Sequence, residues 1–187
     1  MILPITKLGE DILRQKAQPV PEVTDEIRKL AEDMFETMDA ADGVGLAAPQ
    51  IGLSLRMFVL TADDNVRRVF INPQIIKTSS EMGEYDEGCL SLPKIYETIV
   101  RPVAVTVQAL NENGKPFTLD ADGLLARIIQ HEYDHLEGVV FIDRGDPDFA
   151  KKTEEQMKKR AERAAQKAAE KERKAAKIAA KLAAKGK

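Results

Sequence analysis

A sharp change of composition near residue 150 limits how this chain can fold. Residues 151–187 consist almost wholly of Ala, Lys, Glu, Arg and Gln, contain no proline, and have their only glycine at Gly186. These side chains lose little rotamer freedom in a helix, so the segment is predicted to form one long helix. Because it holds few large apolar residues, we expect its distal half to be solvated and frayed. The segment therefore has little apolar surface to bury.

Charge divides the chain at the same place. Residues 151–187 hold 14 basic and five acidic residues, a net charge of +9, whereas the other 150 residues hold 14 basic and 26 acidic ones, a net charge of −12. Clustered Lys and Arg displace counterions from phosphate, which favours a contact with nucleic acid. A solvated helix that aids solubility is the plainer alternative. Base stacking is not expected, because no aromatic residue lies among the basic ones.

Composition also excludes several classes of protein. A chain of 187 residues with 43% hydrophobic residues can bury a real core, so a fully disordered chain is excluded. No run of about 18 uncharged apolar residues occurs, so no membrane span is expected. The opening segment is too acidic and too interrupted for a signal peptide. The single cysteine cannot form an internal disulfide, which fits a reducing compartment, and we expect a cytoplasmic location.

The pattern of residues 1–150 is typical of an α+β fold. Two segments have the apolar spacing of amphipathic helices, residues 25–40, with Thr24 or Asp25 as its cap, and residues 122–138, with Asp120 or Asp122 as its cap. Strands are predicted for residues 55–62, 67–79, 98–110 and 139–143, and a return strand over residues 115–121 after the turn at Asn113-Gly114. Strands clustered between two helices favour α+β over alternating βαβ units.

Both histidines of the chain lie in one short motif, His131-Glu132-Tyr133-Asp134-His135. Residues four apart share a helix face, so both imidazoles can bind one divalent metal, with Glu132 beside them as a general base. A chance match on a polar helix surface is the alternative. The flanking apolar residues indicate a buried helix, in which such a cluster without a metal would leave polar groups unpaired.

The lone cysteine is the candidate for a third ligand. A catalytic metal commonly has three protein ligands and one open position, and the two histidines supply only two of them. Cys89 lies in the motif Glu87-Gly88-Cys89-Leu90-Ser91, and its thiolate would bind Zn²⁺ or Fe²⁺ well. The alternative is that Cys89 is a small buried hydrophobic residue.

A glycine-containing loop, Gly43-Val44-Gly45-Leu46-Ala47-Ala48-Pro49-Gln50, precedes both motifs. Its glycines permit positive φ or a close approach of a ligand to the backbone. The loop lacks the spacing of phosphate- and dinucleotide-binding loops. Gln50 could donate an amide N–H to a developing oxyanion. A plain tight loop between a helix and a strand is the alternative.

Taken together and in this order, GVGLAAPQ, EGCLS and QHEYDH resemble the motifs of the peptide deformylase family. The resemblance covers roughly residues 1–148. It implies an α+β fold with antiparallel sheets around a central metal-binding HExxH helix, an N-terminal helix and a long basic C-terminal helix. It also implies a catalytic domain in residues 1–150 and a basic helical extension in residues 151–187.

The activity implied by the resemblance is removal of formate from N-formylmethionine at the start of newly made polypeptides. The implied metal ligands are Cys89, His131 and His135, with Fe²⁺ the usual metal and Zn²⁺, Ni²⁺ or Co²⁺ able to replace it. Glu132 would take a proton from the metal-bound attacking water and pass it to the leaving amine. The remaining implied roles are the oxyanion donors, Gln50 and the Leu90 N–H, and the substrate-binding residues, Val44, Gly45, Ile128 and Glu87.

Chemistry from the residues agrees with that activity and adds an expectation about iron. A thiolate ligand leaves a divalent site with less positive charge than three imidazoles would. Such a site acidifies bound water less, so we expect catalysis to depend more on Glu132 as the general base. An Fe²⁺–thiolate pair is also prone to oxidation, which predicts loss of activity in air.

The chain departs from the family pattern in two places. Some members carry Glu-Gln-Arg where Lys94, Ile95 and Tyr96 stand here, so an arginine that often contacts the peptide is absent at Tyr96. Arg127 takes a helix position that is apolar in some relatives, and we expect its stem to cover the pocket rim while its charge stays in water.

Three further interpretations concern partners and rival classes. The resemblance implies that the basic tail docks on the ribosome, binding ribosomal RNA, whereas no DNA or membrane partner is expected. A zinc peptidase would take its third ligand from a downstream acid such as Glu154 or Glu155. A non-catalytic RNA-binding protein would need neither Glu132 nor Gln50.

Overall fold

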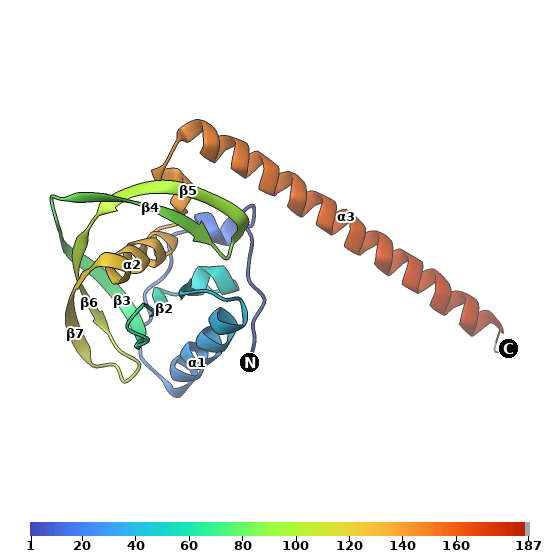
Figure 1. Ribbon diagram of the computed structural model, residues 1–187. Helices are drawn as coiled ribbons and strands as arrows, with labels where there is room; N and C mark the ends of the chain where they lie inside the picture. The colour runs from blue at the N-terminus through green and yellow to red at the C-terminus, as the bar shows by residue number, and fades with distance from the viewer. Residues whose placement is uncertain (186–187) are drawn as a thin grey trace.

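The computed structural model describes the backbone of residues 1–185 and the side chains of residues 1–178. Its body contains one five-stranded antiparallel sheet and one two-stranded antiparallel hairpin (Figure 1). The sheet has the order β1-β2-β3-β6-β7, with strands β1 (Gly45–Ala47), β2 (Met57–Thr61), β3 (Arg67–Thr78), β6 (Ala104–Leu110) and β7 (Pro116–Asp122). The hairpin consists of β4 (Met82–Cys89) and β5 (Leu92–Pro102).

Three α-helices accompany the strands within the described residues, α1 (Asp25–Ala40), α2 (Gly123–Leu136) and α3 (Pro147–Lys185). Helix α2 lies between the five-stranded sheet and the β4–β5 hairpin, while α1 packs beside β1 and β2 (Figure 1). Short 3₁₀ turns occupy Asp11–Arg14, Ala48–Ile51 and Phe141–Arg144. The predicted α+β class with antiparallel sheets is therefore confirmed.

The two faces of helix α2 contact different parts of the body. Its apolar face, including Ala126, Ile129 and Leu136, packs with Phe58 and Phe70 of the sheet. A second buried cluster joins α1 to the other end of the sheet, and a third joins the hairpin to the 3₁₀ turn near residue 141 and the start of α3. The opposite side of α2 thus faces the hairpin, and there the polar residues of the helix gather.

Most sequence-predicted elements are confirmed, and their ends have clear causes. Helix α1 has the predicted bounds, and the Thr24 side chain caps it by accepting a hydrogen bond from the Ile27 N–H. Asp122 is the N-cap residue of α2, although its side chain makes no capping hydrogen bond. Gly138 follows α2 with a φ of +72°, the left-handed conformation in which glycine ends helices.

Three sequence-based expectations about strands were wrong or incomplete. Residues 98–110 belong to two strands in different sheets, because Pro102 lacks an N–H and ends β5 before β6 begins. The predicted strand over residues 139–143 is instead a 3₁₀ turn, in which the Asp143 carboxylate accepts from the Val140 N–H. Strand β4 was not predicted, since most of its side chains are polar and exposed and give no alternation.

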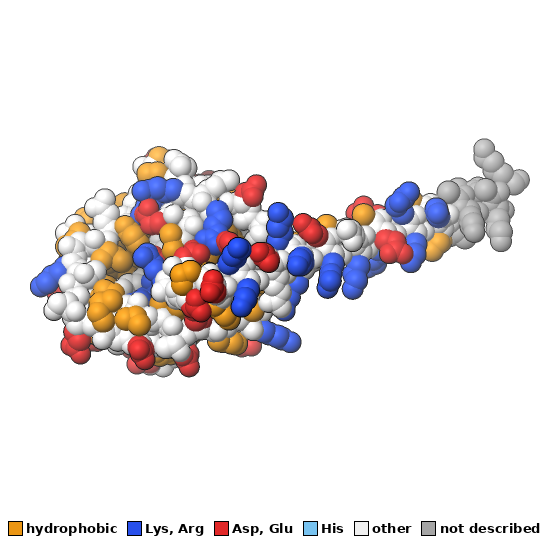
Figure 2. Space-filling model, turned by 90° about the horizontal axis from the view of Figure 1, so that it is seen from above, with side chains coloured by type: hydrophobic (Ala, Val, Ile, Leu, Met, Phe, Trp, Pro, Cys, Tyr) orange, Lys and Arg blue, Asp and Glu red, His pale blue; other side chains and the backbone are white. Residues whose placement is uncertain are grey.

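The predicted tail helix is confirmed through Lys185. Thr153 and Met157 are buried against the body, whereas every side chain from Lys158 to Ile178 is exposed. Lys and Arg side chains dominate its surface beyond the body (Figure 2). The solvated character is thus confirmed as far as Ile178, and the expected fraying of the distal half stays a prediction. Among the described helices none is both long and apolar enough to cross a bilayer.

Candidate active site

Three potential metal ligands converge between the hairpin and helix α2. Cys89 ends strand β4, while His131 and His135 lie one turn apart on α2. One ligand atom from each residue lies within 4.8 Å of those from the other two, and the Cys89 Sγ is 3.3 Å from the His135 Nε2. The helix spacing and the register of the hairpin therefore bring together all three residues that the motifs singled out.

Electrostatics favour the thiolate form of Cys89. Burial by itself would raise the pKa of this thiol, but the imidazoles of His135 and His131 outweigh burial and lower the pKa well below its usual value. A thiolate is the form of cysteine that binds metals. A cluster that holds a negative sulfur beside two imidazoles is suited to a divalent cation.

A buried carboxylate holds the first histidine in place. The Glu87 Oε2 lies 2.8 Å from the His131 Nδ1, which leaves the Nε2 of His131 free for a ligand. Arg101 binds both oxygens of Glu87, at 2.7 and 3.0 Å. Burial would raise the pKa of Glu87, yet the hydrogen bonds from His131 and Arg101 lower it to about 2. Both oxygens of Glu87 accept hydrogen bonds from within the protein. The carboxylate therefore has little remaining capacity to bind substrate, which is the role that the family resemblance implied for it.

The prediction for Arg127 was wrong, because its charge does not stay in water. Arg127 is buried, and its guanidinium donates to the Glu87 carboxylate at 3.0 Å and to the carbonyls of Ile99 and Gly83 at 3.1 and 2.8 Å. The buried carboxylate and the two carbonyls supply the acceptors that make burial of the guanidinium tolerable. Arg127 thus ties α2 to both strands of the hairpin.

A second set of ion pairs, centred on Asp134, was not predicted from the sequence. Asp134, inside the HEYDH motif, accepts from Arg101 at 2.7 Å and from Arg144 at 2.6 and 3.1 Å. Arg101 therefore bridges the two buried carboxylates of Glu87 and Asp134. Arg101 lies on β5 and Arg144 follows α2. Their separation from Asp134 in the sequence therefore gives no pattern from which these ion pairs could be predicted.

Glu132 is the one carboxylate of the motif that lies unpaired beside the cluster. It is 3% exposed, and its Oε2 has no hydrogen-bond partner in the described part of the chain. Burial raises the pKa of Glu132 to about 7, against the opposing effect of the neighbouring His131 and His135. A carboxyl group with a pKa near neutrality can both accept and donate a proton.

Gln50 presents its amide nitrogen to the same place. The Ala47 N–H donates to the Gln50 Oε1 at 2.8 Å, which fixes the orientation of the amide. The Nε2 then lies 3.4 Å from the Cys89 Sγ and 3.3 Å from the Ser91 Oγ. The side chain is buried and sits in the 3₁₀ turn that follows β1.

A cavity of about 600 Å³ opens over these groups. Its lining includes every residue predicted to serve the reaction except His135, namely Val44, Gly45, Gln50, Glu87, Cys89, Leu90, Ile128, His131 and Glu132. Val44 is half exposed, whereas Ile128 is buried in the cavity wall. Tyr96, at the position where some relatives have arginine, is 70% exposed at the cavity's edge.

The residues present fit a divalent metal. One thiolate and two imidazoles form a donor set that suits Zn²⁺ and Fe²⁺. The buried Glu132 Oε2 beside them also lacks a partner among the described residues. By contrast, Glu154 pairs with Arg14 at the protein surface, away from the cavity, which argues against its role as a ligand in a zinc peptidase.

Fold and site together define a hydrolase whose active groups lie between an antiparallel sheet, a helix and a hairpin. The family profile described as polypeptide deformylase matches residues 2–152. The chain therefore belongs to the peptide deformylase family, whose enzymes remove the formyl group from the N-terminus of nascent peptides.

Individual relatives agree with this assignment. The peptide deformylase of Treponema pallidum is 50% identical over 154 residues, which cover 82% of this chain and 93% of the relative. The crystal structure of a peptide deformylase from Legionella pneumophila is similar with a TM-score of 0.79 at 41% identity, covering 88% of this chain and 97% of that one. The enzyme from Ehrlichia chaffeensis, solved in complex with actinonin, gives a TM-score of 0.82 at 38% identity, over 85% and 97% of the two chains.

Proposed function

We propose that this chain removes the formyl group from N-formylmethionine peptides at a metal centre held by Cys89, His131 and His135. The observation that supports this most directly is the unpaired Glu132 carboxylate, buried beside the three converging ligand atoms at the base of an open cavity. A divalent cation in this site supplies Lewis acidity, which polarises a carbonyl oxygen and acidifies water near neutral pH. Fe²⁺ is the proposed metal in the cell, and Zn²⁺, Ni²⁺ or Co²⁺ could replace it.

The side chains then divide the work of amide hydrolysis. Glu132 takes a proton from the attacking water and returns it to the departing amine. The Gln50 amide and the Leu90 N–H donate hydrogen bonds to the oxygen on which negative charge develops. Val44 and Gly45 bind the peptide backbone at the cavity edge, and Ile128 contributes to an apolar pocket for the methionine side chain.

The first test is formate release from a short N-formyl-Met peptide by protein loaded with Fe²⁺ without oxygen. We expect Glu132→Gln and Glu132→Ala to lose activity by about 10³-fold, since general acid–base catalysis contributes on that order. Glu84→Gln, which changes an exposed carboxylate of β4, is the matched control and should retain activity. A folded, metal-loaded wild type that releases no formate would exclude the proposed reaction.

We also propose that residues 1–150 carry the activity and that the basic helix beyond them binds ribosomal RNA. Support comes from the exposed Lys and Arg side chains along α3, which extend away from the acidic body (Figure 2). The expected cytoplasmic location stays a prediction. Because Thr153 and Met157 are buried in the body, a deletion must leave them in place.

Ribosome co-sedimentation at low and high salt tests the tail. Full-length protein should pellet with ribosomes at low salt and be released at high salt, because counterion release drives such binding. A chain that ends after residue 163 should remain in the supernatant while keeping its deformylase activity. Equal, salt-insensitive pelleting of both forms would contradict the proposal.

A further inference from the structure

The N-terminal segment formed by residues 6–8 binds the backbone on both sides of the active site. On one side it contacts the 3₁₀ turn that carries Gln50. The Thr6 N–H donates to the Gln50 carbonyl at 2.8 Å, and the Thr6 hydroxyl donates to the Pro49 carbonyl at 3.1 Å. These bonds fix the backbone of the residue whose amide nitrogen faces the Cys89 sulfur.

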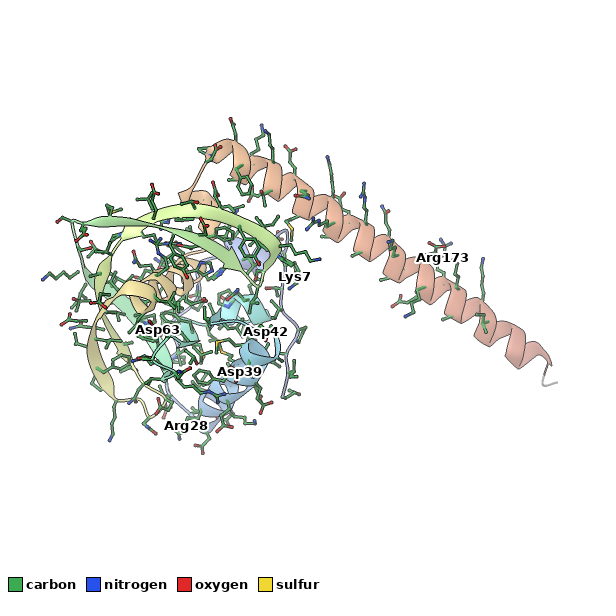
Figure 3. All side chains as sticks on the ribbon, viewed as in Figure 1. Lys7, Arg28, Asp39, Asp42, Asp63 and Arg173 are labelled. Atoms are coloured by element: carbon green, nitrogen blue, oxygen red, sulfur yellow. The ribbon has the colours of Figure 1, made fainter. Side chains whose placement is uncertain are left out.

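On the other side the same segment contacts the turn between β4 and β5. The Lys7 ammonium donates to the Leu90 carbonyl at 2.8 Å, and the Leu8 N–H donates to the Ser91 carbonyl at 3.0 Å. Figure 3 shows Lys7 beside this turn. The bond from Lys7 is charge-assisted and therefore stronger than a neutral one. Three consecutive residues thus join the two chain segments that carry the proposed oxyanion donors.

The N-terminal segment is itself packed against the hairpin and helix α3. Leu8 is buried with Leu92 and Met157, which belong to the hairpin and to α3. Gly9 has a φ of +112°, and a Cβ placed there would lie 3.7 Å from the Lys158 Cα. The N-terminal segment is therefore packed between the active-site turns and the first turns of α3, so it can act as a fixed support.

We propose that Lys7 is a positioning residue for deformylation, which holds the Leu90 carbonyl and thereby the backbone of the β4–β5 turn, so that the Leu90 N–H and the Gln50 amide converge on one oxygen. The proposal rests on the proposed function. Oxyanion donors act on charge that develops in the transition state, so their placement affects kcat more than substrate binding. Misplacing a reacting group by about 1 Å can cost on the order of 10²-fold in rate. Lys7 itself need not touch the substrate for this effect.

The test compares Lys7→Met, which keeps a stem of four atoms and removes the ammonium at its end, with Lys115→Met on the exposed β6–β7 turn. We expect Lys7→Met to lower kcat by about 10-fold with KM within about twofold of wild type. Tm and bound metal per chain should match those of Lys115→Met, which should have wild-type kcat. Amide hydrogen exchange at Leu90, measured by NMR on the zinc-loaded protein, should become faster in Lys7→Met alone.

Further variants complete the test. Lys7→Arg retains a charged donor and should recover part of the lost kcat, and Thr6→Val, which removes only the hydroxyl bond to Pro49, should lower kcat by a smaller factor. Wild-type kcat in Lys7→Met would overturn the inference, and so would a loss of kcat that follows a loss of bound metal or of Tm. If Lys7→Met does not fold, wild-type kcat in a folded Lys7→Gln, whose shorter neutral side chain loses the charge-assisted bond to Leu90, would likewise overturn it. Wild type without formate release would instead reject the proposed function.

Discussion

At the scale of single residues, the missing side chain of a glycine in the loop of residues 43–50 leaves room for another side chain of the protein, and not only for a ligand. A Cβ placed on Gly45 would lie 2.8 Å from the Glu132 carboxylate carbon, closer than real Cβ contacts come. The sequence indicated a close approach to this backbone, and the structure identifies Glu132 as one group that makes it. Gly45 therefore provides the space in which the proposed base sits.

Replacement of Gly45 by alanine should displace Glu132 from its place beside Cys89, His131 and His135. We expect kcat for formate release to fall by about 10- to 100-fold, because general acid–base catalysis contributes roughly 10²–10⁴-fold and depends on geometry. Steady-state kinetics and metal analysis provide the measurement, and metal content should stay at the wild-type level since no ligand changes. Unchanged kcat in Gly45→Ala would show that Glu132 has room to move without penalty.

Local spacing was sufficient to predict the cluster, but it was insufficient for the groups around it. His131 and His135 share a helix face by their separation alone, and Cys89 stood out as the single cysteine. The partners of Glu87 could not be predicted, because Arg101 and Arg127 reach it from β5 and α2. Whether a guanidinium lies in water or in a buried ion pair depends on the path of the hairpin.

At the scale of elements, α3 changes character along its length. Its first turns are part of the body, as Met157 is 3% exposed, whereas Ile178 near the other end is 60% exposed. Helix periodicity and composition predicted α1, α2 and α3 well. They could not predict where α3 leaves the body, since that depends on contacts with Leu8 and with the 3₁₀ turn at Phe141.

Two alanine substitutions on this one helix should separate packing from exposure. Met157→Ala should lower the free energy of unfolding by about 2–3 kcal/mol, because it opens a cavity in a buried cluster. Ile178→Ala should change it by less than about 0.5 kcal/mol, as is usual for exposed positions. Urea denaturation followed by circular dichroism measures both. Equal effects would mean that α3 does not rest on the body through Met157.

At the scale of the whole molecule, the proposed metal centre joins parts that are distant in sequence. Cys89 belongs to the hairpin and the two histidines belong to α2, so a cation held by all three links the hairpin to the helix at the centre of the body. A ligand that binds only the folded state stabilises that state.

Removal of the metal should therefore destabilise the protein. We expect a chelator to lower Tm by several degrees, since a shift of about 1 kcal/mol corresponds to roughly 2–4 °C for a domain of this size. Differential scanning calorimetry before and after addition of Zn²⁺ checks this, with Cys89→Ser as the control that should respond weakly to both treatments. A chelator-insensitive Tm in a metal-loaded wild type would contradict a cation at this position.

The projecting helix also determines how the molecule moves through solution. Helix α3 has 39 residues and would span roughly 58 Å, most of it beyond the body (Figure 1). Such an appendage increases hydrodynamic drag far more than it increases mass. A single chain would therefore elute early in gel filtration and resemble a dimer, so its mass is better determined by light scattering than by elution volume.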